Sequence, residues 1–407
     1  MVDVVKCVGA ALLAATLVLC AQAQEALRAE VGKPLQAAQE LIKAGRYKEA
    51  LAKVREADAV GGKSAGETLM VERMRLAAAS GAGEVDTAAR AFETIDASGK
   101  VANADKLRMI ESIAGSYYRA HDYAHALQWY QRYFKEGGTN AANRTLMIQT
   151  QYLSGDLAGA TKELIGEIQA AEKNGTAPAE ERINLLMNAA VKQKDVNAET
   201  FALERLVIYY PKKEYWVSLL SGLQRKPAFS DRLSLDTYRL SLATGSMSAG
   251  ADYSEMAQLA LQAGSPAEAQ QVVDKGFAAG ALGVGAQAER DKRLRDLVAK
   301  RNAEALKSQA ADEQAAQAAR DGGELVTIGL NRVFQGQAAQ GLALMQQGLA
   351  KGNLKHPEDA KLHLAIAQLR AGDPARAQAT LKTVSGTDGT ADLARLWALY
   401  ARRAKAS

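Results

Sequence analysis

The sequence predicts an all-α fold in which antiparallel helix pairs stack into a solenoid. A short signature, in which Gly or Asp is followed a few residues later by Ala, recurs along the chain at regular intervals. Amphipathic segments with apolar residues at helical spacing flank these signatures. Proline is scarce, with 7 residues in 407, and no run alternates apolar and polar residues as a strand would. The chain is therefore expected to be a helical array rather than a compact enzyme.

The first 23 residues are expected to be an export signal that is removed. A weakly basic start precedes the apolar run 7–20, and small residues then lead to a cleavage point after Ala23. The run is shorter than the roughly 20 residues that a membrane-spanning helix needs. Cleavage would make Gln24 the first residue and place the protein in the periplasm. The alternative is lipid anchoring at Cys20, although Leu19 stands where a lipobox has a small residue.

Composition excludes several classes of function for the exported chain. Both cysteines, Cys7 and Cys20, lie in the signal, so disulfides, cysteine metal sites and thiol catalysis are not expected. The whole sequence has 51 basic and 46 acidic side chains, a net charge of +5, with both signs interspersed. Its densest basic stretch, 290–301, contains acids as well, so no nucleic-acid partner is expected. No later apolar run approaches the length of a membrane span.

The repeated signature begins with AGRYKEAL, residues 44–51. Similar stretches follow it: AHDYAHAL (120–127), SGDLAGAT (154–161), AGSPAEAQ (263–270) and AGDPARAQ (371–378). Weaker copies centred on Ala88, Glu199 and Gly341 make the successive steps 38, 38, 34, 39, 70, 72 and 36 residues. Each of the two long steps leaves room for one degenerate unit. Steps of this size are typical of stacked helix pairs.

These residues resemble the tetratricopeptide repeat (TPR) family, whose unit is about 34 residues. The third unit carries the family's small, aromatic, turn and packing positions at Ala114, Tyr117, Asp122, Ala126 and Tyr130. The second unit lacks the aromatic, and the regions near 215–245 and 286–321 match poorly, but the resemblance covers most of 30–385. It implies a TPR-like helical-pair solenoid, a right-handed superhelix in which the first helices of the pairs line a concave groove.

The expected organisation has three parts after the signal. Residues 24–285 are expected to form a TPR-like superhelix of about seven pairs. Residues 286–322, rich in Ala, Gln and charge with few apolar residues, are expected to be a helical connector, either one long helix or a degenerate repeat. Residues 323–407 are expected to hold two more pairs, with 390–403 as a capping helix that shields the last apolar face. Trp397 in that helix is interpreted as a core residue.

No motif in the sequence strongly predicts catalysis. Residues 57–64 (ADAVGGKS) fit a relaxed phosphate-loop pattern, but a helix and not a strand precedes them, so a Gly-rich turn between repeats is expected. His121 and His125 are four apart without a third ligand, and His356 and His363 share no helix face, so structural roles are expected. No nucleophile elbow or acid–base pair stands out. The protein is therefore expected to be non-catalytic, without metal or cofactor.

The surface of the first helices is the predicted binding site. In the groove of units three to five the alignment places Arg108, Tyr118, Arg119, Gln149, Tyr152, Asn184, Asn188 and Lys192. Amides and aromatic rings suit backbone hydrogen bonding and stacking against an extended segment. Glu111 stands where the carboxylate clamp of some TPR cochaperones has a lysine, so recognition of a free C-terminus is not expected. The alternative interpretation is an ordinary solvated helix face.

These features predict a non-catalytic periplasmic scaffold or adaptor that binds a polypeptide partner in its groove. The stretch YYPKKEYWVSLL (209–220) is similar to one in exported TPR proteins associated with TonB-type systems, which suggests an envelope assembly or transport component. One alternative is a lipid-anchored outer-membrane or cell-wall assembly factor of the same fold. The other is an enzyme with an unrecognised site.

Overall fold

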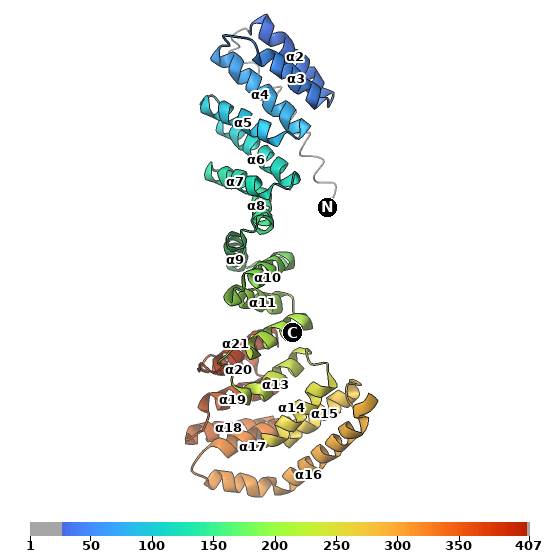
Figure 1. Ribbon diagram of the computed structural model, residues 1–407. Helices are drawn as coiled ribbons and strands as arrows, with labels where there is room; N and C mark the ends of the chain where they lie inside the picture. Colours follow the sequence, from blue (N-terminus) through green and yellow to red (C-terminus); the bar gives the residue numbers. More distant parts are fainter. Residues whose placement is uncertain (1–26, 405–407) are drawn as a thin grey trace. The chain divides into compact units, whose positions relative to one another are not determined.

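The computed structural model describes residues 27–404, and these residues are helical almost throughout (Figure 1). They form twenty α-helices, α2 to α21, with two 3-10 turns, and contain no strand. The chain divides into two compact units, one up to Ile165 and one from Gly166, each of which is described by itself. The export-signal prediction, with Cys20 and Gln24, lies outside the described residues.

The first unit consists of consecutive helix pairs built on small buried residues. The helices are α2 (Ala29–Lys43) and α3 (Tyr47–Asp58), α4 (Ala65–Ala82) and α5 (Val85–Ala97), α6 (Asn103–Arg119) and α7 (Tyr123–Lys135), and α8 (Ala141–Ser154), with α9 (Leu157–Lys173) crossing the division. From α2 to α8 each helix packs on the next. Ala50, Ala88 and Ala126, the small residues of the signature, are all at most 1% exposed. Because they lack bulk, the two helices of a pair approach closely.

The turn inside each recognisable pair contains a residue in the left-handed conformation. These residues are Gly45, Gly83, His121, Gly155, Lys194, Gly264, Gly336 and Gly372, and the steps between them equal those of the sequence signature. The next residue begins the second helix, and there Asp122, Asp195 and Asp373 accept hydrogen bonds from backbone N–H groups. The predicted all-α fold of helix pairs is therefore confirmed.

The second unit continues with further pairs and then one long helix. Its pairs are α10 (Glu180–Gln193) and α11 (Val196–Tyr209), α12 (Lys213–Gln224) and α13 (Ser234–Thr244), and α14 (Gly250–Gln262) and α15 (Pro266–Ala278). The turns η2 (Asp231–Leu233) and η3 (Gly285–Gln287) precede α13 and α16 (Ala288–Ala318). Then follow α17 (Gly323–Phe334) and α18 (Ala338–Lys351), α19 (Pro357–Arg370) and α20 (Pro374–Leu381), and α21 (Thr390–Ala404).

Helix α16 is a single helix of 31 residues between α15 and α17. Val298 near its start is buried in the core of α13–α15, and Ala316 near its end is buried with residues of α17 and α18. Between these two points most side chains are exposed, and Leu306 is 50% exposed. The second long step in the repeat thus holds one helix and not a pair, because the sequence there offers too few apolar residues for a second packed helix.

The helices after α16 turn back along the second unit and cover the second helices of its earlier pairs. In Figure 1 the red and orange helices α17–α21 lie beside the yellow-green α13 and the yellow α14 and α15. Helix α15 packs on α17, and α21 packs on α11 and α13. The backbone N–H of Ala267 on α15 donates to Asn331 Oδ1 on α17 at 3.0 Å. Trp397 on α21 is 3% exposed, as a core residue should be. Helix α21 therefore packs on α19 and α20 and also on α11 and α13, so it does more than cap the last pair.

Polar side chains are buried at this fold-back. Arg239 on α13 donates to Glu268 on α15 at 2.7 and 2.5 Å and to Asp236 on its own helix at 2.6 Å. Asp236 also lies 3.0 Å from Nε2 of His363, which belongs to α19 and is 127 residues away in the chain. The three charged residues of α13 and α15 are at most 5% exposed. They are a structural ion cluster that joins the two layers.

Candidate functional site

The predicted binding residues all lie on first helices of pairs, in two sets. Arg108, Tyr118 and Arg119 are on α6 and Gln149 and Tyr152 on α8 of the first unit, whereas Asn184, Asn188 and Lys192 are on α10 of the second. The left-handed turns fix how the repeats correspond. The 34-residue step from His121 to Gly155 makes Tyr118 the counterpart of Tyr152. The exposed and half-buried side chains of α4, α6 and α8 form what we call the first-helix face.

Tyr118 connects two helices of this face. Its hydroxyl donates to Oε1 of Gln149 at 3.3 Å, so α6 and α8 meet here through two predicted residues. Its ring is half-buried and packs edge-to-face on Tyr123, with 5.7 Å between the ring centroids. Burial, together with the nearby Tyr123, raises the pKa of Tyr118, so the phenol stays neutral. The tyrosine presents a ring of fixed orientation at the surface.

Arg119 lies along the surface of α6 beside a residue without a side chain. Its Nη2 donates to Oγ of Ser116 at 2.8 Å. A Cβ atom on Gly115 would lie 3.4 Å from Nη1 of Arg119, which puts the guanidinium next to that glycine. Arg108, one helical turn before Glu111, is 53% exposed and has Asp105 Oδ1 at 3.5 Å from its Nη2. Both arginines are therefore accessible to a ligand.

The three predicted residues of α10 differ in exposure. Asn184 is half-buried, and its Nδ2 donates to the hydroxyl of Tyr215 on α12 at 3.4 Å. That hydroxyl in turn donates to Glu180 at 2.5 Å, so Asn184 belongs to an internal network between consecutive first helices. Asn188 and Lys192 are exposed. Of these three, Asn188 is the amide best placed to meet a ligand.

Sequence reasoning missed Arg73 on α4. The 38-residue step between the turns at Gly83 and His121 makes Arg73 the counterpart of Glu111 on α6. Arg73 is half-buried, and its Nε is shielded from water without a hydrogen-bond partner. The same repeat step, applied backward from Glu111, could have found it. The predicted groove was confined to repeats three to five, whereas Arg73 lies in the second repeat.

The motifs judged weak in the sequence have structural partners. Residues 57–64 run from the end of α3 into the turn before α4, where Nζ of Lys63 donates to the carbonyls of Asp58 and Val60. His121 Nδ1 lies 2.8 Å from the hydroxyl of Tyr123, and His125 Nδ1 lies 2.7 Å from Asp122 Oδ2. The two imidazoles therefore use different neighbours.

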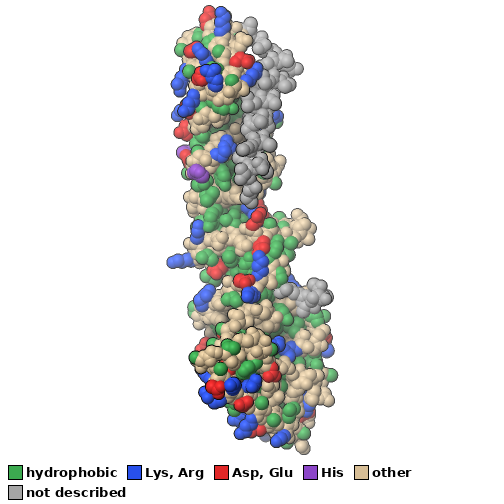
Figure 2. All heavy atoms as spheres, turned by 90° about the vertical axis from the view of Figure 1, so that its right-hand side faces the viewer, with side chains coloured by type: hydrophobic (Ala, Val, Ile, Leu, Met, Phe, Trp, Pro, Cys, Tyr) green, Lys and Arg blue, Asp and Glu red, His purple; other side chains and the backbone are tan. Residues whose placement is uncertain are grey.

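Other kinds of site find little support in residues 27–404. No cluster of three or more His, Cys, Asp or Glu side chains within that range could hold a metal ion. No helix in the same range combines the length and apolar character needed to cross a bilayer. On the surface drawn in Figure 2, basic and acidic side chains are intermixed and form no extended field of one sign.

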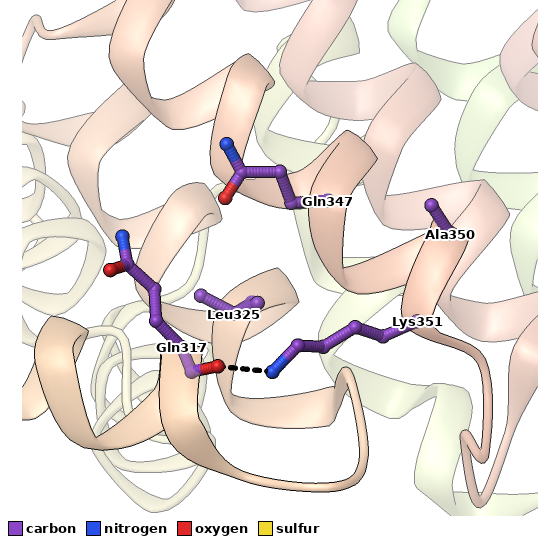
Figure 3. Close-up of a pocket in the computed structure, with 5 residues that line it drawn as sticks. All are labelled: Gln317, Leu325, Gln347, Ala350 and Lys351. Atoms are coloured by element: carbon purple, nitrogen blue, oxygen red, sulfur yellow. Dashed lines mark hydrogen bonds between the residues drawn. The ribbon is translucent and has the colours of Figure 1, made fainter.

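Two surface pockets lie in the second unit, away from the predicted residues. One, of about 460 Å³, is lined by α16, α17 and α18 (Figure 3). There Nζ of Lys351 donates to the carbonyls of Ala316, Gln317 and Ala319 at 3.2, 2.5 and 2.7 Å. A lysine in this place satisfies carbonyls that the end of α16 leaves open. Its role is therefore structural.

The other pocket, of about 350 Å³, lies between α11 and α21. Its charged groups pair with one another. Lys226 Nζ lies 2.7 Å from Asp392, and Arg395 contacts both Glu204 and Asp392. These pairs hold α21 against the earlier helices and leave no converging set of polar groups for a ligand.

No family model matches the chain, and no curated protein sequence matches it. Solved structures with some likeness include yeast Tom70, at 9% identity over 92% of this chain and 96% of that chain, with a TM-score of 0.25. The pentatricopeptide repeat protein PPR10 from maize has 14% identity over 95% of this chain, with a TM-score of 0.28. The Naa15/Naa10 complex bound to HypK-THB has 15% identity over 87%, also at 0.28.

This chain spans 63% of the maize protein and 58% of the Naa15/Naa10 structure's chain, less than two thirds of each. At these TM-scores the likenesses add nothing to what the helix pairs already establish.

Proposed function

We propose that this protein is an exported, non-catalytic scaffold that binds a polypeptide partner on the first-helix face. The observation that carries the proposal is the arrangement of Tyr118, Gln149 and Tyr152 on α6 and α8. Equivalent positions of the two consecutive repeats carry the tyrosine rings. The amide of Gln149 accepts a hydrogen bond of 3.3 Å from Tyr118, which links the helices. Rings and amides at regular spacing suit an extended chain, whose backbone offers groups at regular intervals.

The fold-back of the second unit supports the same choice of surface. Helix α17 packs on α15, and α21 packs on α11 and α13, which are second helices of their pairs. The protein thus uses the second-helix side for its own packing in that unit. The first-helix side is left as the surface on which we place the partner.

The proposal is tested by a crosslinking pull-down from the native cell envelope. The variant with Tyr118 and Tyr152 of this face and Asn188 of α10 in the second unit all replaced by Ala should recover much less partner than the wild type. Losing central anchors of an interface costs about 2 kcal/mol, or roughly thirtyfold in affinity. Asn188 is exposed, and a substitution there should change stability by no more than about 0.5 kcal/mol. Tyr118 packs against the core of the first unit, so its loss also lowers stability, and circular dichroism must show that the triple variant keeps its helicity.

The control for this test alters exposed side chains of second helices. Thr94→Ala on α5 and Gln128→Ala on α7 change polar surface residues on the other side of their pairs. These variants should recover the partner as well as the wild type does. Equal recovery by a folded triple variant would mean that another surface binds.

Location and chemistry need separate measurements. A mature N-terminus at Gln24 supports a free periplasmic protein, whereas diacylglycerol on Cys20 supports the lipid-anchored alternative. Association with a TonB-type system is supported if envelope crosslinks join the chain to components of such a system. Nucleotide hydrolysis by purified protein that disappears in Lys63→Ala would support an enzyme instead.

A further inference from the structure

The first-helix face carries arginines that the chain itself pairs weakly or not at all. Neither a hydrogen bond nor an ion pair joins the guanidinium of half-buried Arg73 to the described part of the chain. Arg119 donates to the neutral hydroxyl of Ser116, and Arg108 has its carboxylate partner, Asp105, at 3.5 Å. An arginine Nε that is shielded from water without an acceptor costs free energy, which a carboxylate ligand would recover.

Other arginines of the first unit form close ion pairs. Arg75, Arg132 and Arg144 each have a carboxylate oxygen at 2.5 to 2.8 Å. The acids Glu67 and Glu72 on α4 pair with Arg28 and Arg75. On α6, Asp105 lies beside Arg108, and Glu111 accepts a hydrogen bond from Asn140 at 3.4 Å. Arg73, Arg108 and Arg119 against Asp105 and Glu111 leave this face positive.

Apolar surface lies beside these charges. Met70 on α4 is half-buried, at the position equivalent to Arg108 one repeat later. The rings of Tyr118 and Tyr152 are also half-buried. A ligand that matches this surface must bring both negative charge and apolar side chains.

We propose, as an inference that rests on the proposed function, that the partner segment is an extended acidic peptide with aromatic or aliphatic residues between its carboxylates. Arg73, Arg108 and Arg119 would each take a carboxylate, since a guanidinium can hold one through two parallel hydrogen bonds. Nucleic acid fits less well, because Glu111 would face its phosphates and the apolar surface would stay unmatched. Complementary charge would also speed association.

The test uses a short fluorescein-labelled peptide in which Asp and Glu alternate with Leu and Phe, and an analogue with Lys at every acidic position. Fluorescence anisotropy should show binding of the acidic peptide to the full chain and little binding of the basic one. The variant with Arg73, Arg108 and Arg119 all replaced by Gln should bind the acidic peptide at least about tenfold more weakly. Added salt should weaken the wild-type complex.

A matched variant separates this face from general attraction to a positive protein. Arg55, Arg90 and Lys135 are exposed on the second helices α3, α5 and α7, and replacing all three by Gln removes the same charge. This variant should keep its affinity within about threefold, since it lacks only distant, screened charges. Equal losses in the two variants, equal binding of the two peptides, or preferential binding of a single-stranded oligonucleotide would each overturn the proposal.

Failure of this inference can be told apart from failure of the proposed function. A photocrosslinker placed at Ser112, a half-buried position one helical turn after Arg108 on α6, reports where the native partner binds. A partner captured there through an acidic segment supports both ideas. Capture through a segment without acids overturns the inference and keeps the function, whereas a partner that crosslinks only to second helices overturns both.

Discussion

Removing the central cation of the buried ion cluster should strongly destabilise the second unit. Arg239 is 5% exposed and holds Glu268 and Asp236, which are 0% and 3% exposed. In Arg239→Met the side chain keeps its bulk, but Glu268 loses two hydrogen bonds of 2.7 and 2.5 Å and stays buried. Breaking a buried ion pair in this way costs about 3–5 kcal/mol. For a unit of this size that lowers Tm by about 6–20 °C.

The assay is urea unfolding followed by tryptophan fluorescence. In a Trp129→Phe background the two remaining tryptophans, Trp216 and Trp397, both lie in the second unit, so the signal reports that unit. The control is Arg301→Met in α16, whose partner Glu304 is 3.4 Å away at an exposed site. An exposed pair of this kind contributes at most about 1 kcal/mol.

A second variant checks the reason for the loss. Arg239→Met combined with Glu268→Met replaces the buried pair by apolar side chains and leaves Asp236 with His363. Because no unpaired carboxylate of Glu268 remains, the double variant should recover most of the stability. A loss below about 1 kcal/mol in the single variant, or a double variant no better than the single one, would refute the argument.

Further predictions concern pH, close packing and a turn. Burial would raise the pKa of Asp236, but the charges of His363 and Arg239 outweigh it and hold the pKa at about 2. This carboxylate therefore stabilises the fold above about pH 4, and as pH falls toward 2 the wild type should lose about 2 kcal/mol more than Asp236→Asn in urea titrations. A Cβ on Gly341 would collide with a backbone carbonyl of α17, so Gly341→Ala should lower the free energy of unfolding by about 2 kcal/mol, measured by thermal unfolding. Gly222 has open space around its Cβ position, so Gly222→Ala in the same assay should raise the free energy of unfolding by up to about 1 kcal/mol. Lys194 has a φ of 58°, so Lys194→Gly should raise stability by about 1 kcal/mol, and a drop would show that the lysine has a stabilising contact.

The candidate site was partly predictable because the repeat itself is. Once the turn positions are known, Tyr118 and Tyr152 follow as equivalent residues on consecutive first helices. The hydrogen bond from Tyr118 to Gln149 was not predictable, since it depends on how closely α6 and α8 approach. Arg73 was not predicted, because the groove residues were taken from repeats three to five and Arg73 belongs to the second repeat. Whether these residues bind a partner stays a prediction.

The sequence by itself determined the helix pairs and the places where they turn. A left-handed residue, a capping Asp and a small packing residue such as Ala126 act within one repeat, so their spacing carries the information. Only the tertiary structure decided that the chain turns back after α16. Contacts such as Lys226 with Asp392, 166 residues apart, and Asp236 with His363, 127 apart, have no local signature. Each partner alone resembles any charged or polar residue on a helix, and only folding brings the two together.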